Sequence, residues 1–196
     1  ETCVTLGSLS LEQAETLKNV GLDFYNHNID TSENYYNEII TTHSYKQRLE
    51  TLNNVRTAGL KICCGGIVGM GETTKDRMEF ILQLANFNPH PESVPINHLI
   101  ATKGTPLENQ PKLPFSEFLR CIATCRIVMP KARIRLSAGR TDLSEHQQML
   151  CLLAGANSLF IGEKLLTQEN PPPNEDLNFI KEFCEGLEES SPPCAL

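Results

Sequence analysis

Several features are missing from this sequence of 196 residues, and each absence excludes a class of protein. No apolar run approaches the roughly 20 residues that span a bilayer, and the first residues lack the charged-then-apolar pattern of a signal peptide. The 17 basic residues are outnumbered by 24 acidic ones and form no cluster, which argues against a nucleic-acid surface. No linker divides the chain. We expect one domain over residues 1–188 with a flexible tail at 189–196, small-molecule ligands, no nucleic acid and no membrane.

The eight cysteines also lack a spacing typical of zinc or of a disulfide framework. They are scattered through apolar segments of a chain that is large enough to fold without covalent crosslinks, which favours free thiols in a reducing compartment. Cys121 and Cys125 lie four residues apart on one helical face, but no histidine or second cysteine pair accompanies them. We interpret these two and Cys151 as packing residues.

Apolar stretches with strand character alternate with amphipathic helical segments along the whole chain. Such alternation predicts βαβ units and a parallel sheet. Six strands amount to a partial (β/α)8 barrel of the TIM type with about six βα units, because a complete barrel takes about 250 residues. The chain opens with Glu1 rather than Met, so we expect a piece of a longer barrel. The expected strands cover residues 2–6, 22–29, 60–68, 93–100, 133–137 and 158–161, and the expected helices cover 10–20, 45–58, 75–87, 115–129, 145–154 and 175–186.

Polar residues gather where the expected strands end, and that end of a parallel barrel builds the active site. Asn28 and Asp30, two residues apart, would share a strand face and suit the diol of a ribose. An Asx turn or a helix cap leading into residues 31–33 is an equal alternative. Asn97 lies late on another strand. Glycines at residues 65–71 permit close approach of a ligand, or else a tight turn, but lack the spacing of a dinucleotide fingerprint or a P-loop.

Charged and sulfur-bearing side chains lie inside the expected strands. Arg133 and Arg135 share a face, so one is expected near the rim and one deeper, where it needs an anion or a metal-bound group; a salt bridge between loops is the alternative. Cys3 and Cys63 occupy matching places in two repeats of the strand and helix pattern. Inward residues of a barrel converge, so these two cysteines predict thiolates gathered at one metal cluster.

Six ordered segments of the chain together resemble the biotin synthase family. They are ETCVTLG (1–7), YNHNIDTS (25–32), CCGGIVGMGE (63–72), ESVPIN (92–97), RLSAGR (135–140) and GANSLF (155–160). The resemblance implies an eightfold barrel of the radical S-adenosylmethionine (SAM) type. It also implies sulfur insertion into dethiobiotin to form biotin, with a [2Fe-2S] cluster as the sulfur donor. Another radical SAM barrel enzyme, or a non-catalytic iron–sulfur protein, is the alternative.

The resemblance implies roles for individual residues. Cys3, Cys63 and Arg135 match ligands of the [2Fe-2S] cluster, Ser93 and Ser158 match residues close to it, and Cys64 should point away and pack. Asn28, Asp30 and Ile67 match SAM-binding residues. Asn28, Asn97 and Thr167 match residues that bind dethiobiotin, although Gln168 stands where many relatives have a second threonine.

The family's [4Fe-4S] cluster needs a Cys-x-x-x-Cys-x-x-Cys loop, and no such spacing occurs among these eight cysteines. We therefore expect the ligands of the [4Fe-4S] cluster to lie outside this chain and the chain alone to be inactive. The resemblance further implies a reductant protein of flavodoxin or ferredoxin type and a homodimer at full length. The compartment would be the bacterial cytoplasm or, in a eukaryote, the mitochondrial matrix.

Overall fold

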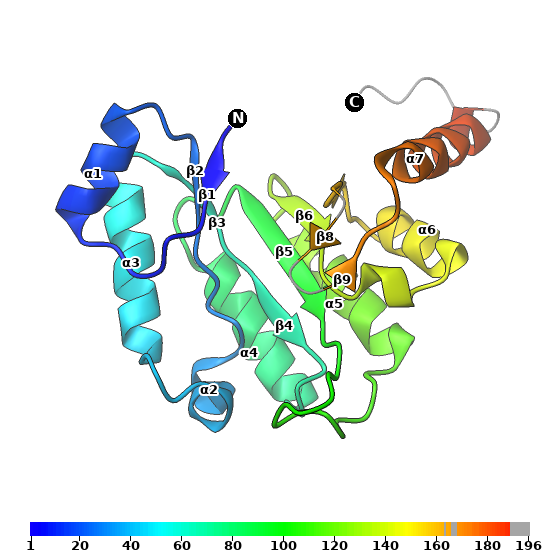
Figure 1. Ribbon diagram of the computed structural model, residues 1–196, viewed down its shortest axis with the longest axis horizontal. Helices are drawn as coiled ribbons and strands as arrows, with labels where there is room; N and C mark the ends of the chain where they lie inside the picture. Colours follow the sequence, from blue (N-terminus) through cyan, green and yellow to red (C-terminus); the bar gives the residue numbers. More distant parts are fainter. Residues whose placement is uncertain (163, 166–167, 189–196) are drawn as a thin grey trace.

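Seven short parallel strands form one curved sheet in the computed structural model, which describes residues 1–162, 164–165 and 168–188 (Figure 1). Neighbouring strands follow the order β1-β2-β3-β5-β6-β7, and β4 also pairs with β5. This order follows the chain order, as in a barrel built from successive βα units. The strands are β1 (Cys3–Val4), β2 (Phe24–Asn26), β3 (Lys61–Cys63), β4 (Gly66–Val68), β5 (Ser93–His98), β6 (Arg133–Leu136) and β7 (Ser158–Leu159).

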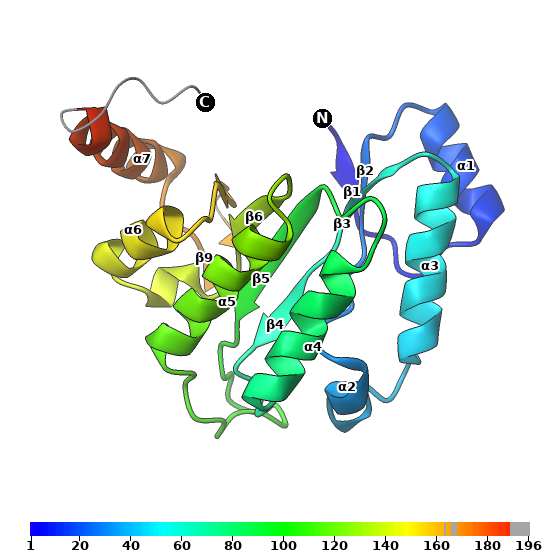
Figure 2. The same cartoon turned by 180° about the vertical axis from the view of Figure 1, so that it is seen from behind.

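Helices follow the strands and cover one face of the sheet, as α4 and α5 do in the reverse view (Figure 2). None of the helices in the described ranges is long and apolar enough to cross a membrane. The α/β partial barrel expected from the sequence is confirmed. The helices are α1 (Leu11–Asn19), α2 (Glu33–Ile39), α3 (Tyr45–Thr57), α4 (Thr74–Ala85), α5 (Phe115–Val128), α6 (Glu145–Leu153) and α7 (Pro173–Glu188), with a 3-10 turn at Arg140–Asp142.

The sheet and helices enclose an apolar core between them. Val94, Ile96 and Ile134 of adjacent strands are fully buried and meet Phe118 and Ile122 of α5. Along β5, Val94 and Ile96 alternate with residues that face the other side of the sheet, because successive strand residues point to opposite faces. The opposite face of the sheet is therefore the one that carries the polar side chains described below.

One predicted strand is divided in the structure. Residues 60–68 form β3 and β4, because the ladder to the preceding segment is irregular at Gly65. The N–H groups of Ile29 and Asp30 both donate to the carbonyl oxygen of Gly65, at 3.1 and 3.3 Å. A Cβ on Gly65 would lie 1.8 Å from the carbonyl oxygen of Pro95. Gly65 therefore serves close packing against the backbone of the neighbouring strand.

Two elements were not predicted. Helix α2 begins after Ser32, whose hydroxyl accepts from the N–H of Tyr35 at 3.2 Å, so Ser32 caps this helix rather than Asn28 or Asp30. An antiparallel pair, β8 (Lys164–Leu165) with β9 (Gln168–Glu169), follows β7. Its two-residue strands are too short to produce a recognisable apolar alternation. Both elements lie beyond the carboxyl ends of strands.

Helix boundaries follow capping residues, and one cap offers a direct test. Ser10 accepts from the N–H of Gln13 at 3.3 Å, and Gln13 accepts from the N–H of Ser10 at 2.9 Å. We expect Ser10→Ala to lower the free energy of unfolding by about 1 kcal/mol, since the N–H of Gln13 loses the hydroxyl that accepts its hydrogen bond. Urea unfolding would measure it. Ser8→Ala, at an exposed position two residues earlier, is the control and should change nothing measurable.

Candidate functional site

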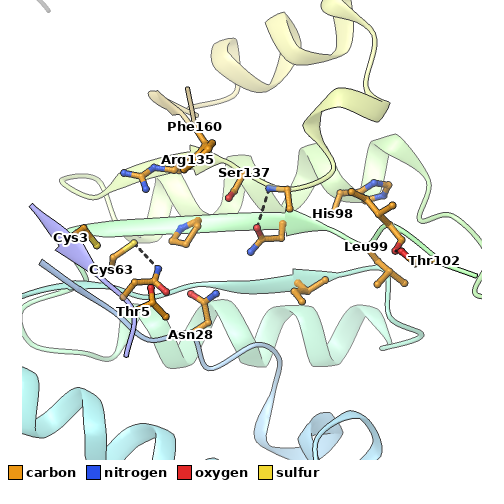
Figure 3. Close-up of a pocket in the computed structure, with 16 residues that line it drawn as sticks. Cys3, Thr5, Asn28, Cys63, His98, Leu99, Thr102, Arg135, Ser137 and Phe160 are labelled. Carbon is orange, nitrogen blue, oxygen red and sulfur yellow. Dashed lines mark hydrogen bonds between the residues drawn. The ribbon is translucent and has the colours of Figure 1, made fainter. Parts of the chain in front are cut away.

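A cavity of about 510 Å³ lies on the face of the sheet opposite α4 and α5 (Figure 3). Its volume falls within the range of small-molecule sites. Cys3, Cys63 and Arg135 lie together at one end of it, and Leu99 and Thr102 lie at the other. The cavity is lined by Cys3, Thr5, Asn26, Asn28, Cys63, Ile67, Pro95, Asn97, His98, Leu99, Ile100, Thr102, Arg135, Ser137, Ala138 and Phe160.

Two thiols meet at the floor of this cavity. Strand pairing sets Asn26 of β2 beside Cys63 of β3, and Cys63 beside Ser93 of β5. The amide Nδ2 of Asn26 donates to Cys63 Sγ at 3.2 Å, and the Cys63 thiol lies 3.4 Å from Ser93 Oγ. Cys3 of β1 is hydrogen-bonded to the Cys63 sulfur as well. Side chains from three neighbouring strands thus meet at the Cys63 sulfur, and the predicted convergence of the two cysteines is confirmed.

The surroundings of Cys63 favour its ionised form. The hydrogen bond with Cys3 is the largest cause, those with Ser93 and Asn26 add to it, and together with the nearby charge of Arg135 they lower the pKa of Cys63 to about 6 despite burial. The same hydrogen bond raises the pKa of Cys3, because Cys3 keeps the shared proton. One thiolate is therefore present near neutral pH, and a thiolate is the form that binds iron.

The two arginines of β6 differ as expected. Arg133 forms an ion pair with Glu1 at 2.7 Å, and about half of its side chain is exposed. Arg135 lies deeper, lines the cavity and donates from Nε to Ser158 Oγ at 3.2 Å. The guanidinium of Arg135 is thereby held near Cys3 and Cys63, and Ser158 lies against it as Ser93 lies against Cys63.

The remaining cysteines of the core are packing residues, as predicted. Cys64 is fully buried and belongs to the apolar core rather than to the cavity lining, since adjacent strand residues face opposite sides. Cys121, Cys125 and Cys151 are also buried in that core. Burial raises the pKa of each of these helical thiols, so they stay protonated.

Asn28 and Asp30 do not share a strand face, which corrects the sequence interpretation. Strand β2 ends at Asn26, and Asp30 has a φ of 66°, so alternation no longer applies. Asn28 lines the cavity and its Oδ1 accepts from the N–H of Gly65 at 3.0 Å. The carboxylate of Asp30 lies outside the lining and pairs with Arg48 at 3.0 Å. Burial raises the pKa of Asp30, and the Arg48 charge opposes that shift.

Asn97 and Ile67 are neighbours in the β4 to β5 ladder, and both line the cavity. The amide of Asn97 donates to the carbonyl oxygen of Gly66 at 2.9 Å and accepts from the N–H of Ala138 at 3.1 Å. These two bonds fix the orientation of the amide. A second N–H and a second lone pair stay available to a ligand.

Some lining residues were missed from the sequence, and one predicted residue is not placed. Ser137 was quoted only within a motif, yet it lines the cavity two residues after Arg135, as strand periodicity would have indicated. Thr102 and Phe160 come from loops after β5 and β7, which carry no periodic signal. Thr167 lies outside the described residues, so its predicted contact with dethiobiotin stays a prediction.

Sequence comparisons divide the chain between two families. Residues 1–85 match the Radical SAM superfamily, and residues 95–184 match the Biotin and Thiamin Synthesis associated domain. A biotin synthase of Hahella chejuensis is 59% identical over 183 residues, which cover 93% of this chain and 52% of the relative. A biotin synthase of Legionella pneumophila is 60% identical over 171 residues, which cover 87% of this chain and 54% of the relative. The chain thus spans about half the length of the curated relatives that it matches.

Solved structures agree on the fold. HydG, a maturase of the [FeFe]-hydrogenase, superposes with a TM-score of 0.78 at 16% identity, covering 93% of this chain and 43% of HydG. A methylornithine synthase superposes with a TM-score of 0.70 at 19% identity, covering 98% of this chain and 58% of that protein. At such identities the likeness concerns architecture alone. The family rests on the sequence matches: at about 60% identity over roughly nine-tenths of its length, the chain belongs to the biotin synthase family of radical SAM proteins.

Proposed function

We propose that the protein carrying this chain converts dethiobiotin to biotin by radical SAM sulfur insertion. The observation that carries the proposal is the meeting of Cys3, Cys63 and Arg135 in the same cavity as the amides of Asn28 and Asn97. A sulfur-inserting enzyme needs both halves of this arrangement: thiolates that hold a sulfur-bearing cluster, and polar groups that orient an organic substrate beside it. Similarity to curated biotin synthases at about 60% identity supports this assignment.

The donor set fits the family's [2Fe-2S] cluster as part of its ligand shell. Iron–sulfur clusters are held chiefly by thiolates. Cys3 and Cys63 would supply two of them, and Arg135 would supply a third contact. The described residues contain no group of three His, Cys, Asp or Glu side chains placed to bind a metal, so a further ligand comes from elsewhere. Bound there, the cluster supplies sulfur, while the [4Fe-4S] cluster and SAM supply the radical that activates the substrate.

Residues of this chain would place the substrate over the thiols. Asn97 lies on β5 beyond Pro95, which pairs with Arg135, so its amide faces the cavity above the thiol layer. A ureido ring offers a carbonyl acceptor and N–H donors, and an amide held as that of Asn97 is held can meet both. Asn28 faces the same cavity from the end of β2. Their bonds to the backbone orient both amides in advance, which lowers the cost of binding.

The SAM side of the proposal concerns Asp30, Ile67 and Arg48. Ile67 presents an apolar side chain to the cavity, which suits an adenine face. Burial raises the pKa of Asp30, and the charge of Arg48, 3.0 Å from the carboxylate, opposes that shift. An ionised carboxylate accepts hydrogen bonds from both hydroxyls of a ribose. In this arrangement Arg48 positions Asp30.

Two substitutions in the full-length protein test these roles. Asn97→Ala should weaken dethiobiotin binding by about 1 kcal/mol per lost hydrogen bond and leave SAM binding nearly unchanged. Asp30→Asn should weaken SAM binding by more, since it removes a charged acceptor, and leave dethiobiotin binding nearly unchanged. Titration calorimetry with each ligand gives the four affinities. Parallel losses of both ligands in both variants would reject the division of roles.

The proposal extends to partners and compartment on the strength of the family resemblance. A reductant protein of flavodoxin or ferredoxin type would deliver electrons, and the full-length protein would form a homodimer. The compartment would be the bacterial cytoplasm or the mitochondrial matrix. The identity of the reductant is tested by measuring biotin formation with a purified flavodoxin and then with a purified ferredoxin as the electron donor.

A further inference from the structure

A second cavity, of about 150 Å³, lies at the opposite end of the strands from the mouth of the larger one. It is lined by residues where strands begin: Thr2 before β1, Phe24 at the start of β2, Ser93 at the start of β5 and Arg133 at the start of β6. The larger cavity is instead lined by residues where strands end, such as Asn97 and Ser137. We call the smaller space the lower cavity and the larger one the upper cavity.

The two cavities share three residues. Cys3, Cys63 and Arg135 line both of them. The thiols therefore form a partition that is reached from either end of the strands. Such a position is unusual for a site whose reactants all arrive from the carboxyl ends of the strands, which is the ordinary arrangement in parallel barrels.

Size and charge indicate what the lower cavity admits. Its volume has room for a few molecules of water size but falls well below the range of organic ligand sites, whereas the upper cavity falls inside that range. Arg133 and Arg135 line it, and Lys61 lies at its rim, where it pairs with Glu1 and sits over Phe24. Against them stand the carboxylate of Glu1 and the thiolate of Cys63, which leaves one excess positive charge. A small inorganic anion therefore suits this space.

An exposed ion network closes the outer side of the lower cavity. Glu1 pairs with Lys61 at 2.7 Å and with Arg133 at 2.7 Å, and all three side chains are about half exposed. The cations of Lys61 and Arg133 also lie over the ring of Phe24, 4.9 and 5.7 Å from its centre. Exposed ion pairs contribute little stability, so this closure opens at small cost.

We propose that the lower cavity is an inlet through which hydrosulfide reaches Cys3, Cys63 and Arg135 while organic reactants fill the upper cavity. This inference rests on the proposed function. A cluster that gives its sulfur to the substrate must be supplied with sulfide again, and reactants in the upper cavity obstruct that side of the thiols. Arg133 attracts the anion at the rim, and Arg135 receives it beside the sulfur atoms.

The test compares two threonines in the full-length protein. Thr2 lines the lower cavity but not the upper one, and Thr102 lines the upper cavity but not the lower one. Both threonines are exposed, and the hydroxyl of each donates one hydrogen bond. Ferric iron and sulfide are added to protein saturated with SAM and dethiobiotin, without a reductant, and visible absorption follows [2Fe-2S] assembly. We expect assembly in Thr2→Trp to be about tenfold slower than in the unsubstituted protein. Thr102→Trp, whose side chain narrows the upper cavity, should slow assembly less than Thr2→Trp does; an equal or greater slowing would overturn the inlet.

Saturation of the unsubstituted protein with both organic ligands should leave the assembly rate nearly unchanged. A block of assembly by those ligands would overturn the inlet, since it would show that sulfide arrives through the upper cavity. Glu1→Gln gives a second reading that does not depend on a bulky side chain: assembly should be faster, and an equal or lower rate contradicts the proposal. Calorimetric binding of dethiobiotin to the same samples reports on the proposed function separately.

Discussion

Cys63→Ala in the full-length protein is expected to abolish both the visible spectrum of the [2Fe-2S] cluster and biotin formation. The substitution removes the sulfur that accepts from Asn26 and contacts Ser93, and with it the thiolate that forms most readily near neutral pH. Iron bound by thiolates cannot be held by the methyl group of alanine. Cys3→Ala should give the same result. Bound iron, bound sulfide and biotin formed are the three measurements.

Cys64→Ala is the matched control for that experiment. Cys64 is adjacent in sequence and of equal size, but it is fully buried in the apolar core on the other side of the strand. Loss of its sulfur leaves a small cavity and lowers stability modestly. The cluster spectrum and biotin formation should persist. Equal losses in Cys63→Ala and Cys64→Ala would mean that these cysteines support folding rather than cluster binding.

Arg140→Met is expected to lower the free energy of unfolding by about 3–5 kcal/mol, because it leaves the carboxylate of Asp176 buried without its positively charged partner. The two side chains form an ion pair that ties the turn after β6 to the first turn of α7, with exposures of 2% and 4%. Gln148 and the carbonyl oxygen of Phe160 accept from the same guanidinium at 3.2 and 3.3 Å. Chemical unfolding followed by circular dichroism measures the change.

An exposed ion pair on the same helix provides the control. Lys181 and Glu185 lie 3.6 Å apart with exposures of 73% and 61%. Lys181→Met should change stability by less than about 1 kcal/mol. The double variant Arg140→Met with Asp176→Leu should regain part of the loss, since no buried charge is left without a partner. A loss in Arg140→Met as small as that in Lys181→Met would show that the buried pair does not hold α7 in place.

Residue patterns were informative where local chemistry decides structure. Helix α1 lies within the range predicted from the cap at Ser10, and β6 within the range predicted from the apolar residues around Arg135. The inward pair of Cys3 and Cys63 followed from the two-residue periodicity of strands. By contrast, the orientation of the Asp30 side chain depends on the positive φ of that residue and on an ion pair with Arg48 of helix α3. Periodicity cannot indicate either.

The lower cavity shows the limit of sequence interpretation most plainly. Thr2 precedes β1, Phe24, Ser93 and Arg133 each begin another strand, and the four residues have no common spacing or motif. Only the register of neighbouring strands brings them together. Alternation predicted that one of Arg133 and Arg135 lies near the rim, but nothing in the sequence indicated that a space behind Arg133 leads to the cysteines.

The most direct test of sulfur donation from the site of Cys3, Cys63 and Arg135 follows the sulfur atom itself. The [2Fe-2S] cluster of the full-length protein is assembled with heavy-isotope sulfide, excess sulfide is removed, and a single turnover with SAM, a reductant and dethiobiotin is analysed by mass spectrometry. We expect biotin that carries the heavy isotope, in an amount that falls to zero in Cys63→Ala. Biotin that carries only unlabelled sulfur, or labelled biotin from Cys63→Ala, would contradict it.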